Sequence, residues 1–228
     1  MRLTLESSGE VFLGRLSAIE CGRAKVEVLS LLEEGGRLLE DGNISLCVAA
    51  VRPKSLEMSI EKCTEMGISD LCIFCAENSS LPIEVYRKRR ERFLQIIRSA
   101  QKQSGNPRAP KLRLYASLKE LLLEEHGGGD RSDTQRHSDA RILPLAARER
   151  NAMALETTSI ADISYSAAKR AHVVVGPEGG FHKDELELLL GRYGYIPTVL
   201  SNYTLKTETA AIAACAALGC LCLHNFAP

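Results

Sequence analysis

From residue 44 onward, short apolar runs alternate with longer segments in which apolar side chains recur every three or four residues. Short runs are typical of buried strands, and the three-to-four spacing is typical of amphipathic helices. We predict strands at 44–51, 71–76, 112–115, 141–145, 172–175 and 198–200. We predict helices from about Ser55 to Gly67 and at 84–103, 117–125, 183–191 and 207–223. This alternation predicts an α/β domain with a largely parallel sheet.

Residues 10–31 follow a different pattern, in which apolar and polar positions alternate loosely and Gly14 and Gly22 interrupt them. This pattern predicts two short antiparallel strands, which are too little for a free-standing domain. The polar and aperiodic stretch 127–139 predicts a surface loop.

The charges of the chain cancel, with 29 Lys and Arg against 29 Asp and Glu, but they are segregated. Residues 86–113 carry ten basic side chains and one acidic side chain, while the segments on both sides are acidic. A basic band of this kind is either a solvated helix face or a surface that binds a polyanion, and charge alone leaves both interpretations open.

The eight cysteines do not indicate an exported protein, because the N-terminus lacks the pattern of a signal peptide. We expect a cytoplasmic protein with reduced thiols and no membrane contact, since no apolar run approaches the ~20 residues of a membrane span. Cys72 and Cys75 have the spacing of half a zinc or redox site, but no second pair complements them. Their place in an apolar run favours structural thiols, and the same holds for Cys215, Cys220 and Cys222.

The segment 172–181 joins an apolar strand to a helix through a loop with three glycines and a proline. Ligands of α/β sheets bind at the carboxyl ends of strands, and glycines let the backbone approach a ligand closely. The loop is neither the dinucleotide-binding fingerprint nor a phosphate-binding Walker loop. From the residues alone it is a ligand loop or a tight structural turn.

A second segment, 200–210, also links a strand end to a helix. Together the two segments resemble the signature loops of the RsmE-like family of the SPOUT superfamily, which methylates 16S ribosomal RNA to 3-methyluridine. Gly176 to Phe181 match the first family loop, Gly-Pro-Glu-Gly-Gly-Phe, in full. The second loop matches at Leu200, Leu205, Glu208, Thr209 and Ala210. The segments 54–67 and 103–105 resemble further family elements, so the resemblance covers roughly residues 10–225.

The resemblance implies a partial PUA-like, RNA-binding β domain at 1–40 and a SPOUT methyltransferase domain with a C-terminal trefoil knot at 41–228. It also implies S-adenosylmethionine as cofactor, 16S ribosomal RNA or the small ribosomal subunit as partner, and a homodimer. No metal is implied. Two other functions stay open, namely a non-catalytic RNA-binding homologue and a SPOUT methyltransferase with a different RNA target.

The resemblance assigns residues to roles by their place in the matched motifs. The cofactor-binding positions are Leu143, Gly176, Pro177, Glu178, Gly179, Leu200 and Leu205. The catalytic candidates are Lys206 and Glu178. The RNA-binding candidates are Arg87, Arg89, Arg92, Arg98, Lys102 and Tyr203.

The chain departs from the family pattern at several polar positions. Asn78, Asn106, Tyr203 and Lys206 stand where the family has arginines, Ser201 follows Leu200, and His182 stands where a serine often caps the next helix. Lysine keeps the positive charge but lacks the planar fork of arginine. These departures, with a shortened N-terminal domain, bear on RNA binding more than on cofactor binding.

The expected reaction transfers a methyl group to N3 of a uridine that has left its base pair. Lys206 would favour the uridine anion, while alignment would contribute most of the rate. Glu178 would shape the cofactor loop or face the RNA, and Glu208 would complement the dipole of the last helix. Tyr203 would stack on a base or lie on the surface, and His182 would begin a helix rather than act as a base.

Overall fold

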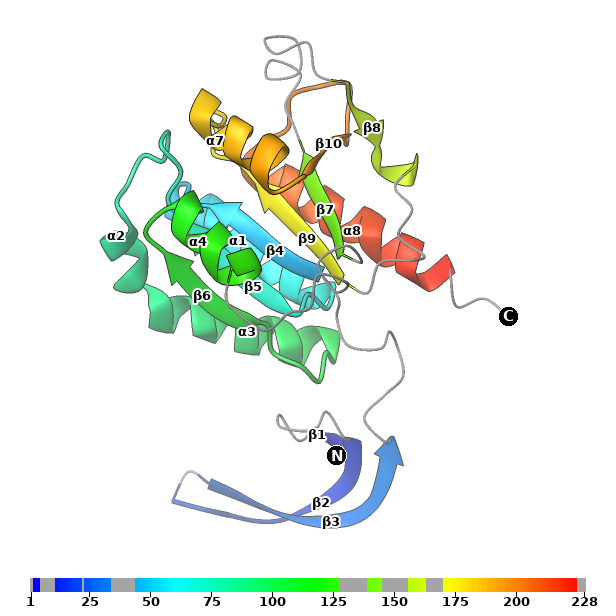
Figure 1. Cartoon of the computed structure of the whole chain (residues 1–228). Coiled ribbons are helices and arrows are strands. Elements are labelled where there is room, and N and C mark those ends of the chain that lie inside the picture. Colours follow the sequence, from blue (N-terminus) through cyan, green and yellow to red (C-terminus); the bar gives the residue numbers. More distant parts are fainter. Residues whose placement is uncertain are drawn as a thin grey trace.

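A seven-stranded parallel sheet forms the centre of the larger part of the molecule (Figure 1). The computed structural model describes residues 2–4, 11–21, 23–33, 44–127, 139–144, 156–162 and 170–224. The strand order is β6-β5-β4-β9-β7-β10-β8. The strands are β4 (Ile44–Ala49), β5 (Asp70–Phe74), β6 (Lys111–Tyr115), β7 (Asp139–Pro144), β8 (Thr158–Ser159), β9 (Arg170–Val175) and β10 (Ile196–Val199). Every strand pair is parallel, which confirms the predicted sheet; only the two-residue strand β8 was not predicted.

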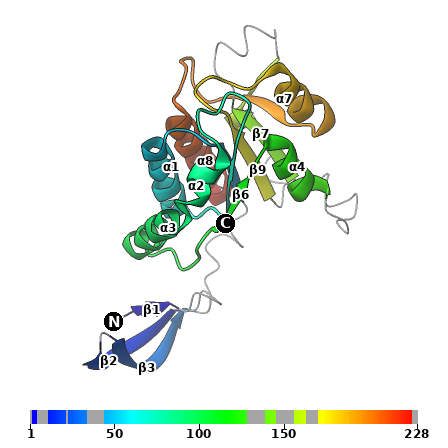
Figure 2. The same ribbon diagram turned by 90° about the vertical axis from the view of Figure 1, so that its left-hand side faces the viewer.

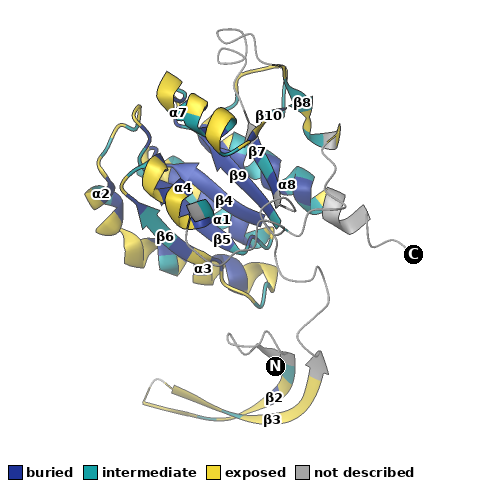
Figure 3. Ribbon diagram, viewed as in Figure 1, coloured by how far each residue is buried: buried dark blue, intermediate teal, exposed yellow. Residues whose placement is uncertain are grey.

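The core lies on both faces of the central strands, as the unbroken apolar run in β4 predicts. Every residue of β4 and β5 is buried (Figure 3). Because side chains alternate along a strand, Leu46 and Val48 join the core under one layer of helices. Cys47 and Ala49 join the core under the other layer.

The helices form these two layers (Figures 1 and 2). One layer contains α1 (Pro53–Glu65), α3 (Arg90–Ser104) and α8 (Thr207–His224). The other layer contains α4 (Leu118–Gly127) and α7 (Lys183–Glu187), and α7 continues as the π-helical turn η2 (Leu188–Arg192). A short helix, α2 (Ile83–Arg87), precedes α3, and a 3-10 turn, η1 (Ile160–Asp162), follows β8. Among the described residues, no helix has the length and apolar content needed to cross a membrane.

The single helix predicted at 84–103 is wrong, because the chain forms two helices there. The amide of Arg89 donates to the carbonyl of Tyr86, a three-residue step that ends α2. Six charged residues follow one another from 87 to 92, so no apolar side chain holds a continuous helix against the core. The inward positions predicted for this helix, Phe93, Ile97 and Ala100, are buried.

The N-terminal residues form a separate antiparallel sheet of β1 (Arg2–Thr4), β2 (Val11–Glu20) and β3 (Arg23–Glu33), with β2 in the middle. The two predicted strands are confirmed, although they are longer than expected and β1 was not predicted. Much of β2 and β3 is exposed, including Leu16, Ile19 and Val28 (Figure 3). The predicted domain boundary near residue 40 and most of the predicted loop 127–139 lie outside the described residues, so both stay predictions.

The thiols bear out the structural interpretation only in part. Cys72 and Cys215 are fully buried, but Cys75 is half-buried and Cys220 is exposed. Cys220 lies near the end of α8, and the side chain of Cys222, which was also expected to be structural, lies outside the described residues. In the described ranges, no three metal-binding side chains gather into one group.

Candidate functional site

Both motif loops leave the carboxyl edge of the sheet. The first loop, residues 176–181, follows β9, and the second loop, residues 200–206, follows β10 and leads into α8. The Thr207 hydroxyl donates a hydrogen bond of 3.0 Å to the Gly176 carbonyl and ties the loops together. The structure therefore brings together two segments that the sequence related only through a resemblance.

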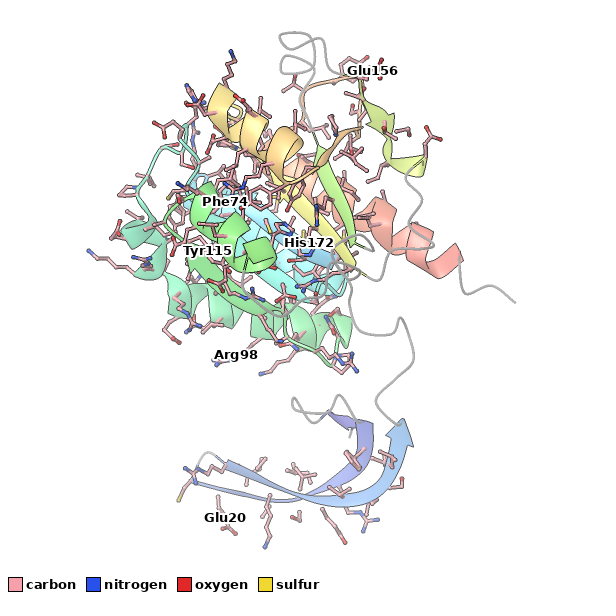
Figure 4. All side chains as sticks on the ribbon, viewed as in Figure 1. Glu20, Phe74, Arg98, Tyr115, Glu156 and His172 are labelled. Atoms are coloured by element: carbon pink, nitrogen blue, oxygen red, sulfur yellow. The ribbon has the colours of Figure 1, made fainter. Side chains whose placement is uncertain are left out.

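Packing explains the first glycine of the loop. A Cβ atom on Gly176 would lie 2.6 Å from Cε2 of Phe181. The Phe181 ring cannot easily move, because it is buried and lies parallel to the ring of Phe74 with 6.5 Å between the centroids. Figure 4 shows Phe74 in this region of the core. Only glycine fits at position 176 without a shift of its neighbours.

Backbone conformation explains another glycine. Gly180 has φ +78°, in the left-handed region, and its amide donates to the Pro177 carbonyl at 2.9 Å. This tight turn requires glycine for a reason independent of packing. Pro177 itself is buried beneath the turn.

A third segment holds the first loop, and the sequence did not reveal it. The Asn78 amide, just after β5, donates to the Gly180 carbonyl at 2.9 Å. Asn78 also lies close to Gly179, where an added Cβ atom would be 3.2 Å from the Asn78 Cβ. The sequence marked Asn78 only as a replaced arginine, although its place at a strand end of the same sheet edge was a usable signal.

The helix α7 begins at the end of the first loop. His182 accepts a hydrogen bond from the Asp184 amide, and its own amide donates to the Glu185 carboxylate. The other oxygen of Glu185 accepts from the Glu77 amide at 3.0 Å. The expected role of His182 as the start of a helix is confirmed.

The two catalytic candidates are exposed. The Glu178 carboxylate lies 4.0 Å from the Arg52 guanidinium, which follows β4. Lys206 precedes α8, and its carbonyl accepts the Ala210 amide at 2.8 Å. Tyr203 is 81 % exposed in the second loop.

The remaining cofactor candidates differ in position. Leu200 and Leu205 are half-buried, and Leu200 packs against the core. Leu143 lies in β7, opposite Pro197 of β10, and nothing is described of its side chain. All cofactor and catalytic roles stay predictions.

Glu208 is a buried carboxylate in the first turn of α8. The residue is 8 % exposed, and its Oε2 atom is inaccessible and accepts no hydrogen bond. Within the described ranges, no ion pair with Glu208 occurs either. A helix-dipole role explains its position in the first turn but not its burial without a partner.

The predicted RNA-binding side chains fall into two groups. Arg89 and Arg92 pair with the Glu57 carboxylate at 3.8 and 3.2 Å, and Arg87 pairs with Glu84 at 3.4 Å. Arg98 and Lys102 are exposed on α3 and have no ion-pair partner among the described residues. Figure 4 shows Arg98 at the surface of this helix. These two carry the charge that is most available to a partner.

Two polar residues of the segment 86–113 serve the fold. Arg113 is held by Asp70 and Glu125 in a largely buried ion cluster near the amino ends of the strands. Asn106, another replaced arginine, donates to the Thr64 carbonyl at 3.0 Å and links the ends of α3 and α1. The sequence revealed neither contact.

The fold is that of an α/β protein, and both motif loops lie at the carboxyl edge of its parallel sheet, the edge at which proteins of this class bind ligands. A family model described as an RNA methyltransferase domain matches residues 39–219. The chain belongs to this RNA methyltransferase family. The resemblance found in the motifs is thereby confirmed.

Several characterised relatives and solved structures are similar to the chain. Ribosomal RNA small subunit methyltransferase E of Aquifex aeolicus is 27% identical over 210 residues, covering 91% of this chain and 82% of the relative. The protein of the same name from Rickettsia conorii is 27% identical over 232 residues, covering 98% and 82%. The structure of the Neisseria gonorrhoeae protein of that name bound to S-adenosyl methionine has a TM-score of 0.75 at 24% identity, covering 97% of this chain and 83% of that chain. A probable rRNA-methyltransferase from Porphyromonas gingivalis has a TM-score of 0.78 at 23% identity, covering 98% and 86%.

Proposed function

We propose that the protein is an S-adenosylmethionine-dependent methyltransferase that modifies ribosomal RNA of the small subunit at N3 of a uridine. The family membership and the names of the relatives support this function. The observation that carries it is the hydrogen bond from Thr207 to Gly176, which unites the two motif loops at the sheet edge.

The residues at the sheet edge fit this cofactor. The loop has glycines at positions 176, 179 and 180, so a ligand against it would meet main-chain groups, and Glu208 offers a buried oxygen that accepts no hydrogen bond from the described residues. When bound, S-adenosylmethionine would supply the methyl group. The positions that would hold it are Leu143, Gly176, Pro177, Glu178, Gly179, Leu200 and Leu205.

Lys206 would act on the substrate base. Methylation at N3 requires the loss of the N3 proton, which leaves negative charge on the uridine ring. A lysine at the end of the second loop stabilises that charge best when water is excluded. Glu178, whose carboxylate lies 4.0 Å from the Arg52 guanidinium, would help to shape the first loop or would face the RNA.

The test of this function is tritiated-methyl transfer onto unmodified small ribosomal subunits, with the modified nucleotide mapped by mass spectrometry. Lys206→Ala should abolish transfer while calorimetry shows retained cofactor binding, and Lys206→Arg should keep part of the activity. Unchanged turnover of Lys206→Ala would remove Lys206 from the mechanism. Methylation of another RNA, or at another atom, would replace the proposed substrate.

The RNA would bind through Arg87, Arg89, Arg92, Arg98, Lys102 and Tyr203. Phosphate contacts supply most of the affinity for a nucleic acid, and an exposed tyrosine in the second loop can stack on an unpaired base. The exposure of Arg98, Lys102 and Tyr203 supports this assignment.

The family resemblance supports further proposals on architecture. Residues 41–228 would contain a trefoil knot, residues 1–40 would form a partial PUA-like domain, and the protein would be a cytoplasmic homodimer. Sedimentation equilibrium tests the dimer directly.

A second candidate function is a non-catalytic RNA-binding protein, favoured by the replaced arginines. Asn78 and Asn106 make hydrogen bonds within the protein. Their side chains therefore serve the fold where arginines would be available to RNA. A titration with S-adenosylmethionine separates the two functions, because the non-catalytic protein has no need to bind it.

A further inference from the structure

The first turn of α8 combines two features that call for a ligand. The first hydrogen bond of the helix runs from the Ala210 amide to the Lys206 carbonyl. The amides before Ala210 in the first turn therefore have no partner within the helix. These amides and the helix dipole favour an anion. Close to them lies Glu208, an anion itself.

The burial of Glu208 makes the turn unusual. Its Oε2 atom is inaccessible to solvent and accepts no hydrogen bond from any described residue. An ionised carboxylate loses most of its hydration in such a place and is stable only with a donor or a cation beside it. In the described part of the chain, no lysine, arginine or histidine forms an ion pair with Glu208. The missing partner is therefore a group that the described residues do not supply.

The position of the turn indicates where this partner comes from. Thr207, the residue before Glu208, is 3 % exposed and donates to the Gly176 carbonyl of the first loop. The turn is thus fixed against the loop that carries the full family motif. A ligand that contacts this loop would therefore lie next to the turn that carries the helix amides and Glu208.

A zwitterion satisfies both features at once. Its carboxylate would receive hydrogen bonds from the amides of the first turn, and its ammonium group would pair with Glu208. The methionine end of S-adenosylmethionine is such a group. A neutral donor such as a ribose hydroxyl would satisfy the hydrogen-bonding need but would leave the buried charge uncompensated.

We propose that Glu208 binds the α-ammonium group of the amino-acid end of the cofactor, beside the amides of the first turn of α8. This inference rests on the proposed function for the identity of the cofactor. It assigns Glu208 a binding role instead of a purely helix-stabilising one.

Isothermal titration calorimetry with three ligands tests the proposal. S-adenosylmethionine has the ammonium group and the sulfonium charge, S-adenosylhomocysteine has only the ammonium group, and methylthioadenosine lacks the amino-acid end. Glu208→Gln should weaken the first two by about tenfold or more, because the negative charge that pairs with the ammonium group is lost. The affinity for methylthioadenosine should stay within about twofold of the wild type.

A matched control separates binding from helix stabilisation. Glu91 lies in the first turn of α3 and is exposed. Glu91→Gln removes a first-turn carboxylate in the same way and should leave all three affinities unchanged. Glu208→Asp keeps the charge on a shorter side chain and should retain part of the preference for ligands with an amino-acid end.

Each other result has a defined meaning. Equal binding of S-adenosylmethionine by the wild type and Glu208→Gln overturns the proposal while the proposed function stands. If Glu208→Gln loses affinity for S-adenosylmethionine only, Glu208 acts on the sulfonium charge. If it loses affinity for methylthioadenosine equally, Glu208 acts on the nucleoside part or on the fold. Either result overturns the ammonium assignment. A wild type that binds none of the ligands overturns the proposed function together with the inference.

Discussion

Replacing Gly176 by alanine tests whether packing against Phe181 fixes the first loop. The added Cβ atom would lie 2.6 Å from one ring carbon and 2.9 Å from the next. Comfortable contacts between carbon atoms are about 3.5–4.0 Å, so the ring or the loop must move by about 1 Å. The ring has little freedom because it is buried against Phe74.

Overpacking of this kind costs about 1–3 kcal/mol of unfolding free energy. For a domain of 150–250 residues, each kcal/mol lowers the melting temperature by about 2–4 °C. A central cost of about 2 kcal/mol therefore predicts a decrease of about 4–8 °C in the melting temperature of Gly176→Ala, measured by calorimetry. Urea denaturation measures the loss of free energy itself.

Gly219→Ala is the matched control, because an added Cβ atom at this position in α8 meets nothing within 4 Å. This change should stabilise the protein by up to about 1 kcal/mol through the higher helix propensity of alanine. Phe181→Leu in the Gly176→Ala background should recover part of the loss, since the two residues are in contact. If Gly176→Ala melts within about 1 °C of the wild type, the loop has space that the structure does not show and the reasoning fails.

Three further predictions concern the surface, the loop and the core. Charge reversal at Arg98 and Lys102 should weaken RNA binding more than reversal of the ion-paired arginines of α2 and α3. It should also reduce the steepness of log affinity against log salt by about 0.7–0.9 for each lost phosphate contact. Equal effects of the two sets of substitutions would contradict the distinction between ion-paired and unpaired basic residues. Asn78→Ala removes the amide donor to the first loop and should cost about 1 kcal/mol of stability. It should also weaken cofactor binding in calorimetry. An unchanged cofactor affinity would show that this hydrogen bond does not shape the site. Burial raises the pKa of Tyr86 to about 12, so the folded state holds the phenolic proton more tightly than the unfolded chain does, and stability should fall as pH rises from about 10 to about 12. Urea denaturation across this range should show a smaller fall for Tyr86→Phe, and an equal fall would assign the alkaline loss to other groups.

The strands and most helices could be predicted because their signals are local. The apolar run at 44–51 identifies a doubly covered strand whatever its neighbours are, and the apolar spacing of α1 does the same for a helix. The break between α2 and α3 was missed because the spacing of apolar residues indicates only that a helix can form. It does not show where the helix loses its contact with the core.

The two loops could be predicted from their motifs, but their connections could not. The bond between Asn78 and Gly180 joins residues that are 102 positions apart. The orphaned oxygen of Glu208 is likewise a property of three-dimensional burial, which no residue pattern in α8 reveals. In both cases the sequence shows the polar side chain but not the residues that surround it in the fold.

The central position of β9 has a consequence for the synthesis of the protein. Residues 44–48 pair with residues 171–175, so β4 has an open edge until β9 has been made. An open strand edge next to a finished half-sheet attracts incorrect pairing, and contacts between distant segments form slowly. The nascent chain must therefore leave this edge of β4 unpaired while residues 50–170 emerge from the ribosome, and both site loops are assembled only after β9 has filled the central gap.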